Sequence, residues 1–134
     1  MTPQELATLA AAMGFKVRID ETGGYGVTRV LVKRDSINPD TGGTEQRECV
    51  FRPHEDAAQA FEVLAWLMKQ HPLHEYDGEI RTSWFEVLGR GIYQSVFANG
   101  EPTAVWSTHN DGTAAGIRRA IVAAAVRVAA NGNG

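Results

Sequence analysis

Three stretches with helical periodicity, at the start, the middle and the end of the chain, are separated by two groups of strand-like segments. Consecutive segments within a group are joined by short turns that are typical of hairpins. Helices that cover such strands bury the apolar face of the sheet and form layers. We therefore predict an α+β fold, a layered sandwich in which a largely antiparallel sheet is covered by about three helices.

The boundaries of the helices follow from capping signals. Thr2, Pro3 and Glu5 are typical of a helix start, and Gly14 of its end. A second helix is expected over residues 56–70, with Trp66 nearly opposite its core stripe. That stripe is made of Ala57, Phe61, Leu64 and Met68, with Ala60 and Leu67 at its margin. A third is expected from residue 112 or 113 to residue 130.

Alternation of apolar and polar residues predicts the strands. They cover residues 15–19, 25–33, 47–51, 80–88, 92–98 and 103–107. Between them, residues 35–45 are rich in Asp, Asn, Pro and Gly and predict a mobile loop. "HPLHEYDG" (residues 71–78) is expected to be a turn-rich connection, "NGEP" (99–102) a tight turn, and residues 131–134 a disordered tail.

Length and charge restrict the functional classes. A chain of 134 residues predicts a single domain over residues 1–134. The formal net charge of −3 gives no overall attraction to DNA, RNA or anionic lipid. Neither a secretory signal nor an apolar run of about 20 residues is visible, so we expect a cytoplasmic protein that is not bound to a membrane. Cys49, the only cysteine, is expected to be a small buried hydrophobe.

Groups of reactive side chains do not form a recognisable catalytic or metal motif. His71, His74 and Glu75 lie in a turn without an obvious third ligand, so we predict no metal and no cofactor. Ser107, His109 and Asp111 occur in triad order in "STHND" (residues 107–111), but triads are assembled by geometry from distant segments. We therefore predict that the protein is not an enzyme, and a hydrolase using His and acidic groups is the least favoured alternative.

The last helix carries two apolar strips. Ile117, Ile121 and Val128 fall on one face, whereas Val122 and Val126 form a second strip. A helix that is apolar on two sides is usually buried on two sides. We expect it to lie between its own sheet and another element, such as a second subunit, and we predict a homo-oligomer.

Arg118 and Arg119 lie about two turns after the start of this helix, on either side of the second strip. Helix N-termini favour anions, and the guanidinium fork suits phosphate. Trp84 and Trp106 could stack on a base. A solvated pair of arginines remains the alternative. The candidate ligand-binding residues are Arg118, Arg119, Trp84, Trp106, His109 and Asp111.

Two segments carry a family resemblance. "FRPHEDAAQAFEVLAWL" (residues 51–67) is similar to F-x-P-x-x-D followed by A-x-x-V-[LV] at a helix start, and "TAAGIRRAIVAAAV" (113–126) to T-A-x-A-I-C-R-A-A-L. Both motifs are those of small phage and prophage proteins with the phage ABA sandwich domain. Arg119 matches the arginine of that family, whereas Gly116 replaces a usual alanine and Arg118 a frequent cysteine.

The resemblance implies helix–sheet–helix layers and a phage or prophage origin, and hence a location in the host cytoplasm. By analogy, small phage proteins of comparable build resemble the anti-Thoeris and anti-CBASS sponges, oligomers that sequester cyclic nucleotide signals without cleaving them. We therefore expect a non-enzymatic anti-defence protein that binds a small nucleotide. The alternative is a phage accessory protein that binds a host or phage protein through Trp66 and the loop 35–45.

Overall fold

The strands and helices of the computed structural model confirm the α+β class. The structure describes residues 1–21, 28–89 and 91–131, which contain three helices and seven strands. All strand pairs in these residues are antiparallel, as predicted. The strands form two sheets, one of three strands and one of four, where the sequence pattern suggested a single sheet.

The chain divides into two compact units, Met1–Arg52 and Pro53–Gly134. Each unit contains one of the sheets and is described by itself. The expectation of a single domain over residues 1–134 stays a prediction.

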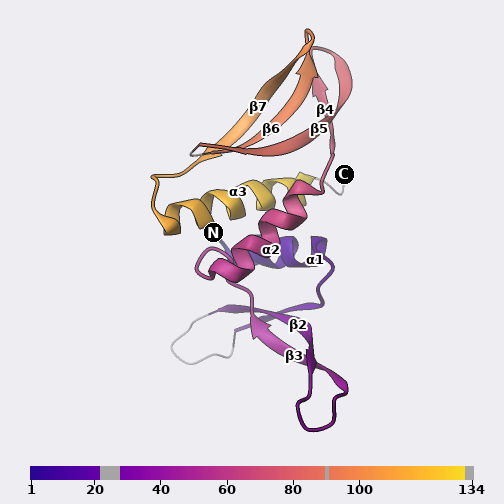
Figure 1. The fold of residues 1–134 in the computed structure, drawn as a ribbon, viewed down its shortest axis with the longest axis vertical. Helices are drawn as coiled ribbons and strands as arrows, with labels where there is room; N and C mark the ends of the chain where they lie inside the picture. Colours follow the sequence, from indigo (N-terminus) through magenta and orange to yellow (C-terminus); the bar gives the residue numbers. More distant parts are fainter. Residues whose placement is uncertain (22–27, 90, 132–134) are drawn as a thin grey trace. The chain divides into compact units, whose positions relative to one another are not determined.

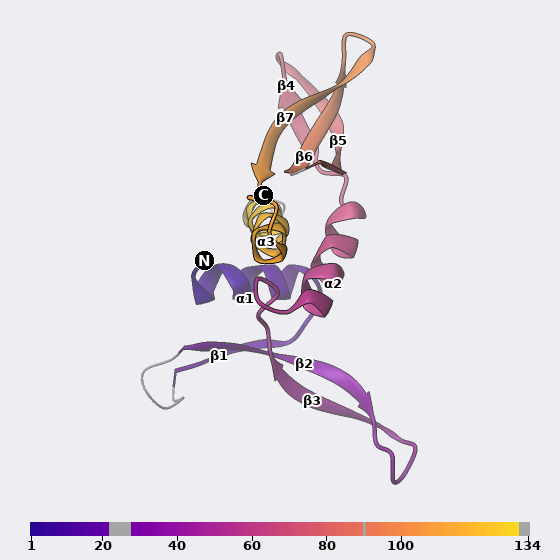
Figure 2. The ribbon, with the colours of Figure 1, turned by 60° about the vertical axis from the view of Figure 1, so that its left-hand side comes forward.

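The first unit is built from one helix and three strands: α1 (Pro3–Ala12), β1 (Val17–Asp20), β2 (Arg29–Ile37) and β3 (Thr44–Val50). The predicted capping box is confirmed, because Glu5 N–H donates to Thr2 Oγ1 and the Thr2 N–H donates to Glu5 Oε1. Helix α1 packs against β1 and β2 (Figure 2). Its apolar side, together with the inner side of the sheet, supplies the buried residues Leu6, Leu9, Ala10, Val30, Val32 and Phe51.

The predicted loop over residues 35–45 is shorter than expected. Asp35 pairs with Gln46 and Ile37 with Thr44, so both ends of that segment belong to β2 and β3. The connection is residues 38–43, closed by a hydrogen bond from Asn38 N–H to Gly43 O at 2.8 Å. Polar residues are tolerated in this hairpin because its side chains are largely exposed. The expected turn between β1 and β2 lies outside the described residues.

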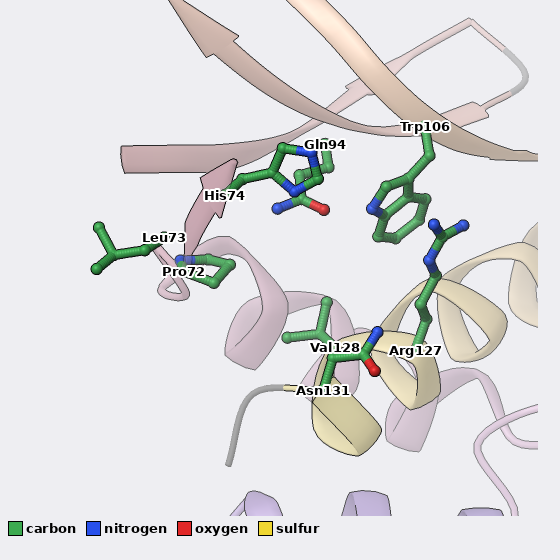
Figure 3. Close-up of a pocket in the computed structure, with 8 residues that line it drawn as sticks. All are labelled: Pro72, Leu73, His74, Gln94, Trp106, Arg127, Val128 and Asn131. Atoms are coloured by element: carbon green, nitrogen blue, oxygen red, sulfur yellow. The ribbon is translucent and has the colours of Figure 1, made fainter. Parts of the chain in front are cut away.

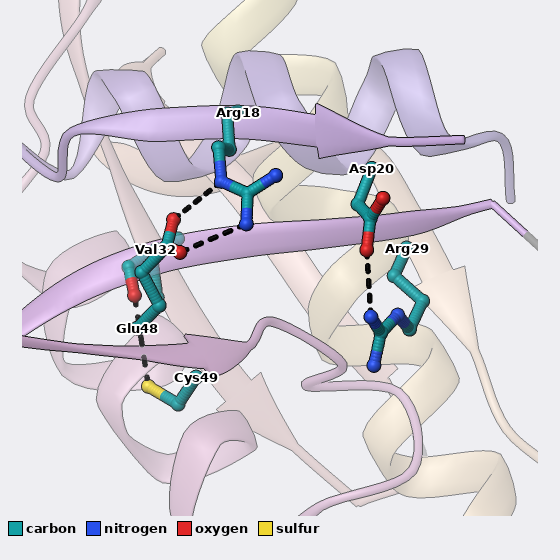
Figure 4. Close-up of polar contacts among 6 residues, drawn as sticks. All are labelled: Arg18, Asp20, Arg29, Val32, Glu48 and Cys49. Carbon is teal, nitrogen blue, oxygen red and sulfur yellow. Dashed lines mark hydrogen bonds and ion pairs between the residues drawn. The ribbon is translucent and has the colours of Figure 1, made fainter. Parts of the chain in front are cut away.

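Polar contacts tie the three strands of the first sheet together (Figure 4). Arg18 donates from Nε and Nη2 to the two carboxylate oxygens of Glu48, at 2.6 and 2.9 Å. Arg29 pairs with the buried Asp20 at 2.6 Å. Cys49, expected to be buried, is only half-buried, and its thiol lies 3.8 Å from the Val32 carbonyl oxygen.

The second unit begins with a helix, continues with a four-stranded sheet and ends with a second helix (Figure 1). Its elements are α2 (Ala57–Met68), β4 (Leu73–Tyr76), β5 (Glu79–Leu88), β6 (Gly91–Ala98), β7 (Glu101–His109) and α3 (Ala114–Asn131). The strand order β4-β5-β6-β7 follows the chain.

Two tight turns set the register of this sheet. The predicted turn at Asn99–Gly100 is confirmed, with φ angles of 54° and 80°. Asp77–Gly78 makes an equivalent turn with φ angles of 53° and 79°. Positive φ at both central residues is the signature of the type I′ hairpin. Residues 71–78, expected to be a turn-rich connection, therefore contain a strand, β4, and the Asp77–Gly78 turn that joins it to β5 in a hairpin.

The buried side of α2 differs from the predicted stripe. Ala60, Val63 and Leu67 are buried, whereas Phe61 is 72% exposed. Nearly every turn of this helix carries apolar residues in several directions, so periodicity could not select the face that meets α3 and β5. Trp66, which the alternative protein-binding function assigned to the surface, is half-buried.

Both apolar strips of α3 are buried within a single chain, except at Ile117. Val122 and Val126 are 0% and 8% exposed, and α3 packs against α2, β6 and β7. Ile117, predicted to be in the core, is 44% exposed because it lies in the first turn of the helix. Burial of the second strip therefore does not require another subunit, and the homo-oligomer stays a prediction that needs other grounds.

Candidate functional site

Three of the six predicted ligand-binding residues line one open cleft at the start of α3. Arg119, His109 and Asp111 belong to its wall, and the cleft has a volume of about 330 Å³. Arg119 is exposed, and its Nη2 lies 3.9 Å from Asp111 Oδ2. Strand β7 ends and helix α3 begins at this cleft, so the chain order itself brings these residues together.

The helix start is already occupied by a carboxylate of the chain. Asp111 Oδ1 accepts hydrogen bonds from Thr113 N–H at 2.9 Å and from Thr113 Oγ1 at 2.6 Å, and Gly116 N–H donates to Thr113 Oγ1. The bonds from Thr113 lower the pKa of Asp111, with a smaller contribution from Arg119. An external anion would meet this negative charge where the helix dipole is most favourable.

Ser107 and His109 lie on the same side of β7, where Ser107 Oγ is 2.8 Å from His109 Nε2. The rings of Tyr93 and His109 pack in a T-shaped arrangement, with their centroids 5.7 Å apart. A serine triad needs a carboxylate that orients the histidine. Asp111 is instead engaged by Thr113, so the three residues of the "STHND" segment do not assemble as a triad.

Arg118 and Trp84 lie away from this cleft. Arg118 is half-buried, and its Nε donates a long hydrogen bond of 3.4 Å to the His54 carbonyl oxygen. Trp84 alternates with the buried Ser83 and Phe85 along β5 and therefore points to the opposite face of the sheet. Its Nε1 donates to Glu86 Oε1 at 2.8 Å.

Trp106 lines a second pocket, between the inner face of the sheet and the C-terminal half of α3 (Figure 3). This pocket has a volume of about 140 Å³. The Arg127 guanidinium carbon lies 4.2 Å from the centroid of the Trp106 ring, and Phe85 packs against the same ring at 5.9 Å. Arg127 therefore covers the aromatic surface on which a base was expected to stack.

A buried amide forms the back of this pocket. Gln94 is 5% exposed and donates from Nε2 to Ser83 Oγ at 2.7 Å, while Ser83 donates to the Pro72 carbonyl oxygen at 2.5 Å. These bonds fix the orientation of the amide. Its oxygen points into the pocket toward Trp106 (Figure 3). The pocket thus presents a rigid hydrogen-bond acceptor.

The lining of this pocket favours an anionic ligand. Arg127 and His74 contribute nitrogen groups, Asn131 contributes an amide, and Pro72 and Val128 are apolar, whereas Leu73 borders the pocket but its side chain points away from it (Figure 3). None of the described lining residues carries a carboxylate. Arginine held over an aromatic ring keeps its donors available for a carboxylate or phosphate. We call this pocket the Trp106–Arg127 pocket. Its lining residues are Pro72, Leu73, His74, Gln94, Trp106, Arg127, Val128 and Asn131.

Sequence reasoning found only Trp106 in this pocket. Gln94 had a detectable signal, because in "IYQSVFA" (residues 92–98) it alternates with Ile92 and Val96 and so falls on the buried face. The sequence signal for Arg127 was weaker: it is the arginine nearest the end of the last helix. Its position over Trp106 depends on how α3 crosses the sheet, which periodicity does not determine.

Residues 1–21, 28–89 and 91–131 form neither a metal-binding cluster nor a membrane-crossing helix. No group of three or more His, Cys, Asp or Glu residues is close enough there to hold a metal ion. His74 and Glu75 lie on opposite faces of β4, which separates two members of the group considered for zinc. None of the helices in these ranges has the length and apolarity that a membrane crossing needs.

Comparisons with protein-family models, curated proteins and solved structures give no match for this chain. The resemblance to the phage ABA sandwich domain therefore rests on its two motifs and stays a prediction. Phe51 and Arg52, the first two residues of the first motif, end the first unit, whereas the rest of that motif leads into α2 and the second motif lies in α3.

Proposed function

We propose that this protein is a non-enzymatic binding protein for a small phosphorylated nucleotide, which it holds at the Trp106–Arg127 pocket. The observation that carries the proposal is the guanidinium of Arg127, which lies over Trp106 beside a buried amide and among lining residues without a carboxylate. In this proposal Arg127 takes the phosphate role that the sequence pattern gave to Arg118 and Arg119.

The size of the pocket limits what enters it. Its 140 Å³ is close to a cavity of about 150 Å³ that holds a benzene molecule. One ring-sized group therefore fits, and the remainder of a nucleotide extends toward solvent past the exposed Arg127. The amide oxygen of Gln94 suits a ligand N–H or O–H group, such as the edge of a base.

Binding without turnover fits an anti-defence role in which a phage or prophage protein sequesters a cyclic nucleotide signal of the host. This role rests on the two phage-like motifs. The arrangement of Ser107, His109 and Asp111 supports a binding function over hydrolysis, because the carboxylate that would orient the histidine is engaged elsewhere.

Calorimetry tests the proposal with a panel of adenosine monophosphate, cyclic adenosine monophosphate, a cyclic dinucleotide and cyclic ADP-ribose. We expect at least one to bind and to be recovered chemically unchanged. Arg127→Gln removes the positive charge but keeps a polar side chain, and should weaken binding about 10- to 100-fold, since a charge-assisted hydrogen bond contributes about 1.5–3 kcal/mol.

Arg119→Gln is the matched control, because it makes the same charge change on the same helix but lines the other cleft. It should leave the affinity unchanged. If Arg119→Gln weakens binding and Arg127→Gln does not, the ligand is held at the start of α3 and the proposed site is wrong. No binding of any member of the panel to the folded protein contradicts the proposed function itself.

A further inference from the structure

The outer face of the four-stranded sheet, opposite α3, is apolar and exposed. Side chains alternate along each strand, and every second residue points away from the helices. Four large apolar residues on this face are more than half exposed: Leu73 at 71%, Ile80 at 64%, Phe97 at 55% and Leu88 at 54%. They come from three adjacent strands, and the half-buried Trp84 and Tyr93 lie among them.

The strand register places Leu73, Phe97 and Pro102 in one row across the sheet. Leu73 on β4 pairs with Thr82 on β5. Ser83 on β5 pairs with Val96 on β6, so the preceding residue of β5, Thr82, lies beside Phe97, the residue that follows Val96. Phe97 in turn pairs with Pro102 on β7. A row of mostly uncharged side chains therefore crosses all four strands. We call this surface, with Ile80, Trp84 and Leu88, the outer sheet face.

Charge on this face is sparse and does not specify a charged partner. Its described carboxylates are Glu75, on the edge strand β4, and Glu86, which accepts a hydrogen bond from Trp84 Nε1. No lysine or arginine among the described residues alternates onto it. Nucleic acid and anionic lipid, which require cations, are therefore poor occupants. An apolar surface of this kind is complementary to itself.

The area of the outer sheet face approaches what a stable dimer needs. Its strands have 4, 10, 8 and 9 residues, and at about 3.4 Å per residue and about 4.8 Å between strands they cover about 500 Å² in projection. The relief of the side chains adds to this area. Stable interfaces begin at about 600 Å² per partner. Two such faces can pack as an aligned sandwich about 10 Å thick, related by a two-fold axis.

We propose that a second copy of this chain covers the outer sheet face, so that two four-stranded sheets pack face to face in a homodimer. This interface differs from the one that the two-sided apolar pattern of α3 suggested. It leaves the Trp106–Arg127 pocket on the opposite side of each sheet, so the dimer and the proposed ligand site can be tested separately.

Sedimentation equilibrium of the full chain at about 1–200 µM tests the dimer. The unaltered chain should have the mass of two copies in the upper part of this range. Phe97→Glu should raise the dimer dissociation constant at least ~30-fold, because it places a carboxylate of each copy in the apolar row that Phe97 shares with Leu73. Leu73→Lys, on another strand, should act in the same direction and provides a second test if Phe97→Glu does not fold.

Phe61→Glu is the matched control, since this phenylalanine is 72% exposed but lies on α2. It should leave the dimer intact. A monomeric unaltered chain at the highest concentration overturns the proposal, as does a dimer that withstands the folded variants at both Phe97 and Leu73. Equal dissociation by Phe61→Glu also contradicts it, because the effect would then not be specific to the sheet.

Discussion

Arg127 and Trp106 form a cation–π pair across the boundary between α3 and the four-stranded sheet, with 4.2 Å from the guanidinium carbon to the ring centroid. Helix and sheet are therefore joined by a polar contact at the mouth of the pocket as well as by the apolar core. The pair also holds in place the charge that the proposed ligand would meet.

A double-mutant cycle should detect this pair in the absence of ligand. Trp106→Leu, Arg127→Gln and the double variant should give a coupling free energy of about 0.5–1 kcal/mol, as found for exposed cation–π pairs. Urea unfolding provides the four free energies of unfolding. Strict additivity of the two single substitutions would mean that the contact contributes nothing to stability.

The hydrogen bonds that hold Gln94 should be costly to interrupt at one end. Ser83→Ala leaves the buried Nε2 of Gln94 and the Pro72 carbonyl without this partner, and should lower the free energy of unfolding by about 1–3 kcal/mol. Ser83→Ala combined with Gln94→Leu should cost less than the sum of the two single substitutions, because no buried amide then lacks a partner. Additive losses would contradict this coupling.

Gly116 should lack the stability gain that alanine usually brings inside a helix. Glycine to alanine inside a helix ordinarily stabilises by about 1 kcal/mol. At Gly116 a Cβ would collide with Asp111 Oδ1 and come within 3.1 Å of Thr113 Oγ1. We expect Gly116→Ala to give little or no gain in the unaltered chain.

In an Asp111→Ala background the obstacle is removed, and the same Gly116→Ala substitution should then stabilise by about 1 kcal/mol in thermal or urea unfolding. An equal effect in both backgrounds would show that the carboxylate does not restrict this position. The collision also gives a physical reason why glycine stands where the resembling motif has alanine.

The corrected face of α2 can be checked by two substitutions of opposite outcome. Leu67 is fully buried, and Leu67→Ala should lower the free energy of unfolding by about 2–5 kcal/mol. Phe61 is 72% exposed, and Phe61→Ala should change it by no more than about 0.5 kcal/mol. A larger loss of stability for Phe61→Ala than for Leu67→Ala would mean that the face predicted from the sequence is the buried one. Urea unfolding at one temperature compares both.

Local signals accounted for much of the fold. The capping box of α1, the Asn-Gly turn and the strands β5, β6 and β7 were predictable because each depends on neighbouring residues, whereas β4 was missed. The face of α2, the division into two sheets and the position of Arg127 depend on how elements cross, and nearly all-round apolarity in α2 and α3 conceals that choice. Cleft residues Arg119, His109 and Asp111 were found because they follow one another along the chain.

Acid should weaken the contact between Arg18 and Glu48. The hydrogen bonds from Arg18 lower the pKa of Glu48 below its ordinary value, and burial opposes this only in part. A carboxylate with a lowered folded-state pKa stabilises the protein above its unfolded-state pKa of about 4.3, and the effect is lost as the pH falls through the folded value.

The unaltered chain should therefore be more stable than Glu48→Gln at pH 7, and the difference should shrink as the pH falls through the folded-state pKa of Glu48. Urea midpoints of both chains over a series of pH values from 7 downward measure this difference. High salt at pH 7 should shrink the difference, because the pair is exposed. A difference that persists unchanged at low pH would show that it does not arise from the charge of Glu48.

The consecutive order of β4, β5, β6 and β7 also sets the sequence of events during synthesis. All pairings of this sheet join residues that are close along the chain, so its loops close at low entropic cost and it can form early. Helix α3, which covers β6 and β7, follows the sheet in the chain, and its 18 residues take roughly 1–4 s at 5–20 residues per second. Until α3 has formed, the buried Ile92 and Val96 on β6 lack its cover, so the core of this unit closes only after its sheet has been made.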